Sequence, residues 1–213
     1  DDSLNVQYFL IDNPGLLLPF QDTLLDEFQQ YDPIRQGRFD RAHLGYLGSA
    51  VQPILWQPQF HQGFELGYRN YDLYQIRTAD IPFYKTDKPF TNLYFSQGAL
   101  QDDNYFKGEF TRDFAGGVNF AIDYKRLNNA GAYRSQRARN TAFGTGFWFH
   151  SPKGKYDVYL TYVYNEIRQR ENGGINLMEV DSTNRDEELT VPVNIVDVAD
   201  SRYTYREFSI LQY

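Results

Sequence analysis

Hydrophobic and polar residues alternate with a period of two after about residue 90. Side chains that alternate in this way fall on opposite faces of an extended chain, which is typical of β-strands with one apolar face. The pattern predicts strands at about residues 103–112, 116–127, 140–150 and 155–168. Two further strands near residues 90–97 and 203–213 complete a set of six, although the hydropathy of the last one does not define its face.

The first 89 residues show no comparable period. Prolines interrupt every apolar cluster there, so long regular elements are not expected. Residues 23–30 have helical spacing of Leu24, Leu25 and Phe28, with Asp22 as the candidate N-cap. Residues 43–57 and 64–76 are candidates for short strands. We therefore expect residues 1–89 to form an irregular N-terminal segment, either periplasmic or lumen-filling.

The links between the predicted strands alternate between short and long. Residues 113–117 and 151–154 read as tight turns that contain glycine, whereas residues 127–139 and 169–202 are long connections. Bacterial outer-membrane barrels have short periplasmic turns and longer extracellular loops, and their strands need about 9 to 11 residues to cross the bilayer. The pattern therefore favours an all-β fold, an antiparallel transmembrane β-barrel, with residues 90–213 as its strands and residues 127–139 and 169–202 as extracellular loops.

In this interpretation each strand has a lipid-facing and a lumen-facing side. Tyr is expected where a strand leaves the hydrocarbon layer, because its ring is apolar and its hydroxyl reaches water. The candidates for these boundary positions are Tyr124, Tyr156 and Tyr164. The lipid-facing candidates are Phe106, Phe110, Val118, Phe120, Ile122, Phe143, Phe147, Phe149, Val158, Leu160 and Tyr162. The lumen-facing candidates are Lys107, Glu109, Asn119, Asp123, Lys125 and Asp157, whose mixed charges would adjust ion preference.

Composition excludes several classes of protein. The chain of 213 residues has no Cys, which removes disulfide scaffolds, cysteine nucleophiles and thiolate zinc sites. Its net charge of -7 argues against a sequence-independent nucleic-acid partner, whose affinity would come from Lys and Arg. No window approaches the roughly 18 to 20 apolar residues of a membrane-spanning helix. The start of the chain resembles a mature or trimmed product without its export signal.

The sequence contains no motif for catalysis, a cofactor or a metal. The three histidines, His43, His61 and His150, lack the spacing of a helical metal motif, and we expect structural or surface roles for them. The carboxylates of residues 169–202 make a calcium site conceivable, but the ordered spacing of an EF-hand loop is absent. Arg134, Arg137 and Arg139 of the other long connection are candidates for binding lipopolysaccharide phosphates, with a solvated turn as the alternative.

Several short sequence motifs occur in order along the chain. They are Tyr-Asp-Pro at 31–33, Leu-Gly-Tyr-Leu-Gly-Ser at 44–49 with Gln-Pro at 52–53, residues 63–74 with Tyr-Asp at 71–72, Pro-Phe-Thr-Asn-Leu at 89–93, Asn-Ala-Gly-Ala-Tyr at 129–133 with Gln136, and Glu-Asn-Gly-Gly-Ile at 171–175. In this order the motifs resemble the putative porins of Bacteroidota outer membranes. The resemblance implies an outer-membrane β-barrel with a pore function and without a catalytic motif. Members of that family are much longer, so the chain resembles an N-terminal portion of them, and we expect either further strands or a partner to complete the barrel.

Three functions follow as hypotheses. The first is a passive outer-membrane channel for small hydrophilic solutes, with outer-membrane lipid and lipopolysaccharide as its surroundings. The second is a non-conducting barrel that serves as a binding or scaffold subunit for other outer-membrane proteins. The third is a secreted carbohydrate-binding β-sandwich, in which Trp56, Trp148 and Tyr159 would stack on sugars. A sandwich should have shorter strands and no Tyr at the strand boundaries.

The number of strands bears on the barrel hypotheses. Two strands from residues 43–76 would raise the six predicted strands to eight, the number in the smallest known barrels.

Overall fold

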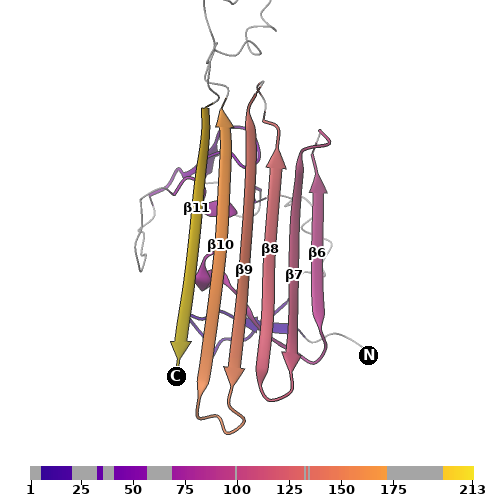
Figure 1. The fold of residues 1–213 in the computed structure, drawn as a ribbon, viewed down its shortest axis with the longest axis vertical. Coiled ribbons are helices and arrows are strands. Elements are labelled where there is room, and N and C mark those ends of the chain that lie inside the picture. The colour runs from indigo at the N-terminus through magenta and orange to yellow at the C-terminus, as the bar shows by residue number, and fades with distance from the viewer. Residues whose placement is uncertain are drawn as a thin grey trace, which may run out of the picture.

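The fold is all-β and antiparallel, and its main element is a single six-stranded sheet (Figure 1). It comes from a computed structural model, which describes residues 6–20, 33–35, 41–56, 69–98, 100–131, 133, 135–171 and 199–213. Each strand pairs with its neighbour in the sequence, in the order β11-β10-β9-β8-β7-β6. The strands are β6 (Phe90–Gln97), β7 (Asn104–Phe114), β8 (Val118–Asn129), β9 (Arg137–His150), β10 (Asp157–Glu171) and β11 (Ala199–Gln212). All six strands were predicted, but in the described residues β6 and β11 are open edges and the sheet does not close into a barrel.

The shortest and the longest links of the sheet lie at opposite ends. Residues 115–117 and 151–156 make the short turns at one end, where Gly117 has a φ of +81° and lies against the backbone of His150. The other three links meet at the opposite end (Figure 1). The strands there are longer than predicted, so the link expected at 127–139 is 130–136 and the one expected at 169–202 is 172–198. Backbone pairing continues through polar residues, which hydropathy alone does not show.

Chain segments before residue 87 cover one face of this sheet. We call the described residues 6–20, 41–56 and 69–86 the N-terminal cover; they lie behind the sheet in Figure 1. The sheet face against the cover is the inner face, and the opposite one is the outer face. The cover contains a three-stranded sheet of β2 (Leu18–Pro19), β1 (Val6–Phe9) and β5 (Phe83–Thr86), the hairpin β3 (Arg41–His43) with β4 (Val51–Pro53), and the 3-10 turns η2 (Asp72–Tyr74) and η3 (Thr78–Asp80).

Two expectations concern this region. The segment expected to be irregular contains these short strands joined by irregular stretches, and β1 pairs with β5 although the two are far apart in sequence; its periplasmic or lumen-filling role stays a prediction. Two strands from residues 43–76 were expected to extend the main sheet, but in the described residues β3 and β4 pair only with each other, and residues 57–68 lie outside the described residues. The helix predicted at residues 23–30 lies outside the described residues. Among the described residues, no helix has the length and hydropathy needed to cross a membrane.

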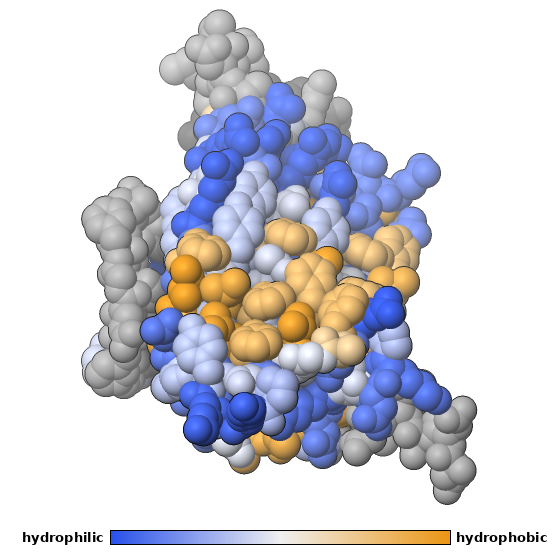
Figure 2. All heavy atoms as spheres, turned by 60° about the horizontal axis from the view of Figure 1, so that its bottom comes forward, coloured by the Kyte–Doolittle hydropathy of each residue, from blue (hydrophilic) through white to orange (hydrophobic). Residues whose placement is uncertain are grey.

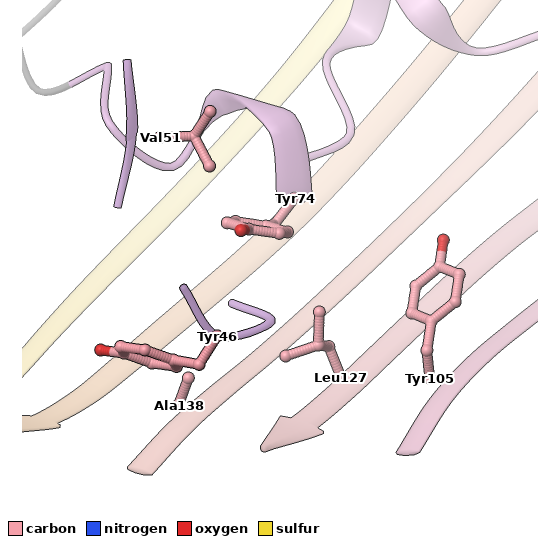
Figure 3. Close-up of a cluster of buried hydrophobic side chains, with 6 residues drawn as sticks. All are labelled: Tyr46, Val51, Tyr74, Tyr105, Leu127 and Ala138. Atoms are coloured by element: carbon pink, nitrogen blue, oxygen red, sulfur yellow. The ribbon is translucent and has the colours of Figure 1, made fainter. Parts of the chain in front are cut away.

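The hydrophobic core lies between the cover and the inner face. In one cluster Tyr46, Val51 and Tyr74 of the cover pack toward Leu127 and Ala138 of the sheet (Figure 3). A second part of the core is aromatic, with Phe9 and Phe83 stacked at 5.6 Å and both rings in edge contact with Tyr159. Burial of this apolar surface holds the cover on the sheet.

Two glycines of β9 provide room for the cover. A Cβ atom on Gly144 would lie 2.9 Å from Ile81 Cδ1 and 3.0 Å from Ile76 Cγ2, and one on Gly146 would lie 2.9 Å from Ile81 Cγ2. These distances are shorter than a normal carbon contact. The absence of side chains at both positions therefore lets Ile76, Ile81 and Phe83 sit directly on the backbone of β9.

We predict that Gly144→Val lowers the free energy of unfolding by about 1 to 3 kcal/mol, because the added side chain overpacks the cover. The matched control is Gly108→Val in β7, where a Cβ atom would meet only the movable side chains of Phe106 and Leu93 at 3.3 to 3.4 Å. Denaturant unfolding of the full chain in detergent compares the two variants. Equal losses in both would show that the cover does not depend on the close approach at β9.

Candidate functional site

The six polar residues expected on one side of the strands lie on the inner face. Glu109, Asn119 and Asp123 are buried there, and Lys107, Lys125 and Asp157 are half-buried. Strand alternation groups them on one face because neighbouring side chains of a strand point to opposite faces. That this face lines a lumen stays a prediction.

Four of these residues form a charge arrangement across β7 and β8. Lys107 lies opposite Lys125, and Glu109 lies opposite Asp123, so like charges face each other across the strands. Opposite charges follow along each strand, with Lys107 Nζ 2.9 Å from Glu109 Oε1 and Lys125 Nζ 3.8 Å from Asp123 Oδ2. Directly opposed like charges are unfavourable, and the pairs along the strands offset this repulsion. The four charges sum to zero.

A small hollow lies between the cover and these lysines. Its volume is about 120 Å³, and its polar lining comes from Lys107, Lys125 and Asn140. Asn140 is buried, and neither polar atom of its side chain has a hydrogen-bond partner among the described residues. Asp123 Oδ1, Asn119 Oδ1 and Gln169 Oε1 share this property on the same face. Buried polar groups are normally hydrogen-bonded, so this interior suits water or polar solutes rather than an apolar ligand.

Asn165 connects the inner face to the backbone of the cover. Its Oδ1 accepts from the N–H of Ile76 at 2.9 Å, and its Nδ2 donates to the carbonyl of Ile76 at 2.8 Å. The side chain is fully buried, at 0% exposure. One amide therefore satisfies both backbone groups of a cover residue, as a neighbouring strand would do.

Further polar contacts repeat this connection along β10 and β11. Gln169 Nε2 donates to the carbonyl of Gly48 at 2.7 Å, and Thr78 Oγ1 donates to Glu207 Oε1 at 3.0 Å. The Tyr46 hydroxyl donates to Glu171 Oε1 at 3.3 Å. Burial, followed by the charge of Glu171, raises the pKa of the Tyr46 hydroxyl above its usual range, so Tyr46 stays protonated as the donor.

Asp157 lies at the turn end of the inner face rather than in its centre. Its Oδ1 is 2.7 Å from His150 Nδ1 and accepts from Trp148 Nε1 at 3.2 Å. Trp148 is stacked on Tyr159, with ring centroids 6.1 Å apart, and is in edge contact with Phe9. Two of the three proposed sugar platforms are therefore packed in the core, and only Trp56 is exposed, at 87%.

The outer face carries a band of apolar side chains. In Figure 2 hydrophobic residues form this band, with hydrophilic residues above and below it. The band is largely exposed on the edge strands, for example at Leu93 with 67% and Phe208 with 62%. All residues predicted to face lipid lie on the outer face: Phe106, Phe110, Val118, Phe120, Ile122, Phe143, Phe147, Phe149, Val158, Leu160 and Tyr162. That this face meets lipid stays a prediction.

The predicted boundary tyrosines lie at the two ends of this band. Tyr124 and Tyr164 flank Phe143 in one cross-strand row near the middle of the three strands, where the apolar band ends. Tyr156 lies in the turn before β10, eight positions before Tyr164, and its hydroxyl donates to Gln212 at 3.2 Å. We call the cross-strand row of Tyr124, Phe143 and Tyr164 the tyrosine row.

The structure assigns no metal site to the described residues, where no group of three or more His, Asp or Glu side chains converges. His43 accepts from the N–H of Gly45, and His150 pairs with Asp157, which are the structural roles expected. His61 and Arg134 lie outside the described residues, as does the acidic link 172–198. Of the two other arginines considered for phosphate binding, Arg137 pairs with Asp102 at 2.7 Å and Arg139 is exposed on the outer face.

Sequence reasoning missed the residues that fasten the cover. Asn165 and Gln169 belong to the polar side of β10, so alternation could place them on the inner face. Their partners Ile76 and Gly48 are 89 and 121 residues away in sequence, and no local pattern indicates such a pairing.

Comparison with protein-family models identifies the family of the chain. A protein-family model described as "Putative porin" matches residues 14–213, nearly the whole chain, which confirms the resemblance to a porin family. No curated protein matches significantly, and neither does any solved structure. The expected Bacteroidota origin stays a prediction.

We predict that Asn165→Leu lowers the free energy of unfolding by roughly 2 to 4 kcal/mol, because it leaves two buried backbone groups of Ile76 unpaired at about 1 to 3 kcal/mol each. The control is Asn128→Leu, which removes one partly buried bond to Asn104 at 3.3 Å on the outer face. Limited proteolysis of the full chain should show faster cleavage within residues 69–86 in the Asn165 variant alone. Unchanged cleavage there would contradict the fastening role of Asn165.

Proposed function

The chain belongs to the putative porin family, and from this premise we propose that it forms part of an outer-membrane β-barrel that allows passive diffusion of small hydrophilic solutes. Membership of a porin family indicates a transport protein and not an enzyme. We propose lipid and lipopolysaccharide of the bacterial outer membrane as its surroundings.

The separation of the two sheet faces is the observation that carries this proposal. The outer face has an exposed apolar band bounded by tyrosines, whereas the inner face has buried amides, hydroxyls and paired charges. A soluble protein rarely exposes a continuous apolar surface of this kind. Outer-membrane barrels show this arrangement, with apolar residues toward lipid and polar residues toward the interior.

The dimensions of the band agree with a bilayer. Tyr156 and Tyr164 are eight positions apart, which is about 26 Å along a strand. With a strand tilt of about 40° this becomes about 20 Å along the membrane normal, comparable to the roughly 25 Å apolar band of outer-membrane barrels. The main strands after β6 have 11 to 15 residues, well above the mean of about 5 to 6 in soluble sheets. Neither the long strands nor the tyrosines fit the sandwich hypothesis.

The cover would set how much of the interior is open. In this proposal the polar inner face lines the water-filled space, and the cover occupies part of it. Irregular backbone at membrane depth is tolerated where it is buried in protein or faces water, and the hydrogen bonds of Asn165 and Gln169 meet that condition. Solutes would pass through the remaining space, where paired charges such as Lys107 and Glu109 adjust ion preference without binding one solute tightly.

A non-conducting scaffold barrel is the second candidate. The observation in its favour is the close contact of the cover with the inner face, where Asn119 and Asn165 are almost completely buried. The open edges of β6 and β11 in the described sheet would also accept strands from another protein.

We predict stepwise conductance when the full-length protein is reconstituted in planar bilayers. The double variant Gly144→Val/Asn165→Leu should give larger steps, because it loosens the cover without shortening the chain. Gly108→Val/Asn128→Leu, with the same types of change at positions away from the cover, should keep the wild-type steps.

The other outcomes separate the two candidates. A silent wild type with a conducting double variant would show that the cover closes the barrel. Silence in all three proteins, with folding confirmed by circular dichroism, would rule out the channel and favour the scaffold.

A further inference from the structure

Five arginines form a cluster on the outer face beyond the tyrosine row. Arg139 of β9, Arg168 of β10 and Arg202 of β11 lie side by side in register across three strands. Arg137 and Arg170 are opposite each other two positions further toward the loop end, on the same face. The five side chains surround a hollow of about 380 Å³. We call this group the arginine cluster.

The carboxylates of the described residues near the cluster do not neutralise it. Glu166 accepts from both Arg168 and Arg202, Asp102 pairs with Arg137, and Asp200 also lines the hollow. These are three carboxylates against five guanidinium groups. In the described part of the chain, Arg139 and Arg170 form no salt bridge. Like charges in adjacent register positions repel each other, so an anion in the hollow would stabilise the cluster.

The position of the cluster identifies the kind of anion. Arg168 is four positions beyond Tyr164, about 13 Å along the strand and about 10 Å along the membrane normal at a tilt of about 40°. The polar headgroup layer begins where the hydrocarbon ends and is roughly 5 to 8 Å thick on each side. About 10 Å places the backbone of Arg168 just beyond this layer, and its long side chain can reach back to the depth at which headgroup phosphates lie. The cluster lies at the end of the sheet that carries the longer links, which in outer-membrane barrels is the extracellular end.

We propose that the arginine cluster binds the phosphates of an outer-leaflet glycolipid, the lipid A part of lipopolysaccharide. Guanidinium groups match phosphate oxygens with two parallel hydrogen bonds, which several arginines around one hollow can supply together. The glycolipid's acyl chains would lie against the apolar band below the cluster. This inference rests on the proposed outer-membrane location but not on conductance.

Binding of lipid A to the purified full-length protein in detergent tests the proposal. The variant Arg139→Gln/Arg170→Gln removes two cations without breaking a salt bridge of the described residues, and we expect its affinity for diphosphorylated lipid A to fall at least tenfold. Arg139→Lys/Arg170→Lys should recover part of the affinity, because charge is kept and bidentate geometry is lost. The matched control is Arg112→Gln, an exposed outer-face residue near the short turns that should bind as the wild type does.

Four results would overturn the proposal. The first is equal binding of diphosphorylated and fully dephosphorylated lipid A, and the second is unchanged binding by the double glutamine variant. The third is no binding by the wild type, as expected if the carboxylates of residues 172–198 neutralise the cluster. Excess inorganic phosphate should compete only weakly, since it lacks acyl chains; full displacement would point to a free-phosphate site and also contradict the proposal. Conductance of the same samples is a separate readout, so a silent protein that binds lipid A would refute the channel alone.

Discussion

A largely irregular chain segment can lie on the inner face of the sheet only if its backbone N–H and carbonyl groups find partners there. Asn165 supplies both partners for Ile76, and Gln169 supplies one for Gly48. Apolar contacts over Gly144 and Gly146 then bring the cover close to the strands. The polar character of the inner face therefore serves the fold directly, because an apolar face could not satisfy the cover. The same polarity makes this face suitable for water and solutes.

The strands were predictable because each face of the sheet has a different environment, which leaves a period of two in the sequence. Two neighbours in β9 illustrate this. The side chain of Phe147 belongs to the apolar band of the outer face, whereas Gly146 lies under the cover on the inner face. Strand ends were predicted less well. Arg137, Arg170 and Asp200 are paired in the ladder, and their hydropathy resembles that of a loop. Backbone hydrogen bonds do not depend on the polarity of the side chain.

The candidate site was predictable in its faces and not in its contacts. Alternation placed Asp123 and Lys125 on the inner face, but their neighbours on β7 depend on the register between strands. The register between strands also brings arginines from β9, β10 and β11 together at one hollow. In the sequence only Arg137 and Arg139 of this cluster stood out, because they lie close together in one connection. Residues 43–57 were expected to contribute one strand, whereas β4 folds back on β3 as a separate hairpin, a pairing that no period in the sequence indicates.

The sheet is a meander in which every strand pairs with the one before it, and the cover precedes all six strands in the chain. Such a sheet grows at one edge, from β6 toward β11, through mostly local pairings that form quickly. If the sheet curves on into a barrel, a cover seated on its inner face has no way in after closure. In the proposed barrel, the order of the chain would then set an order of assembly, in which the cover docks while the sheet is still open and later strands wrap around it.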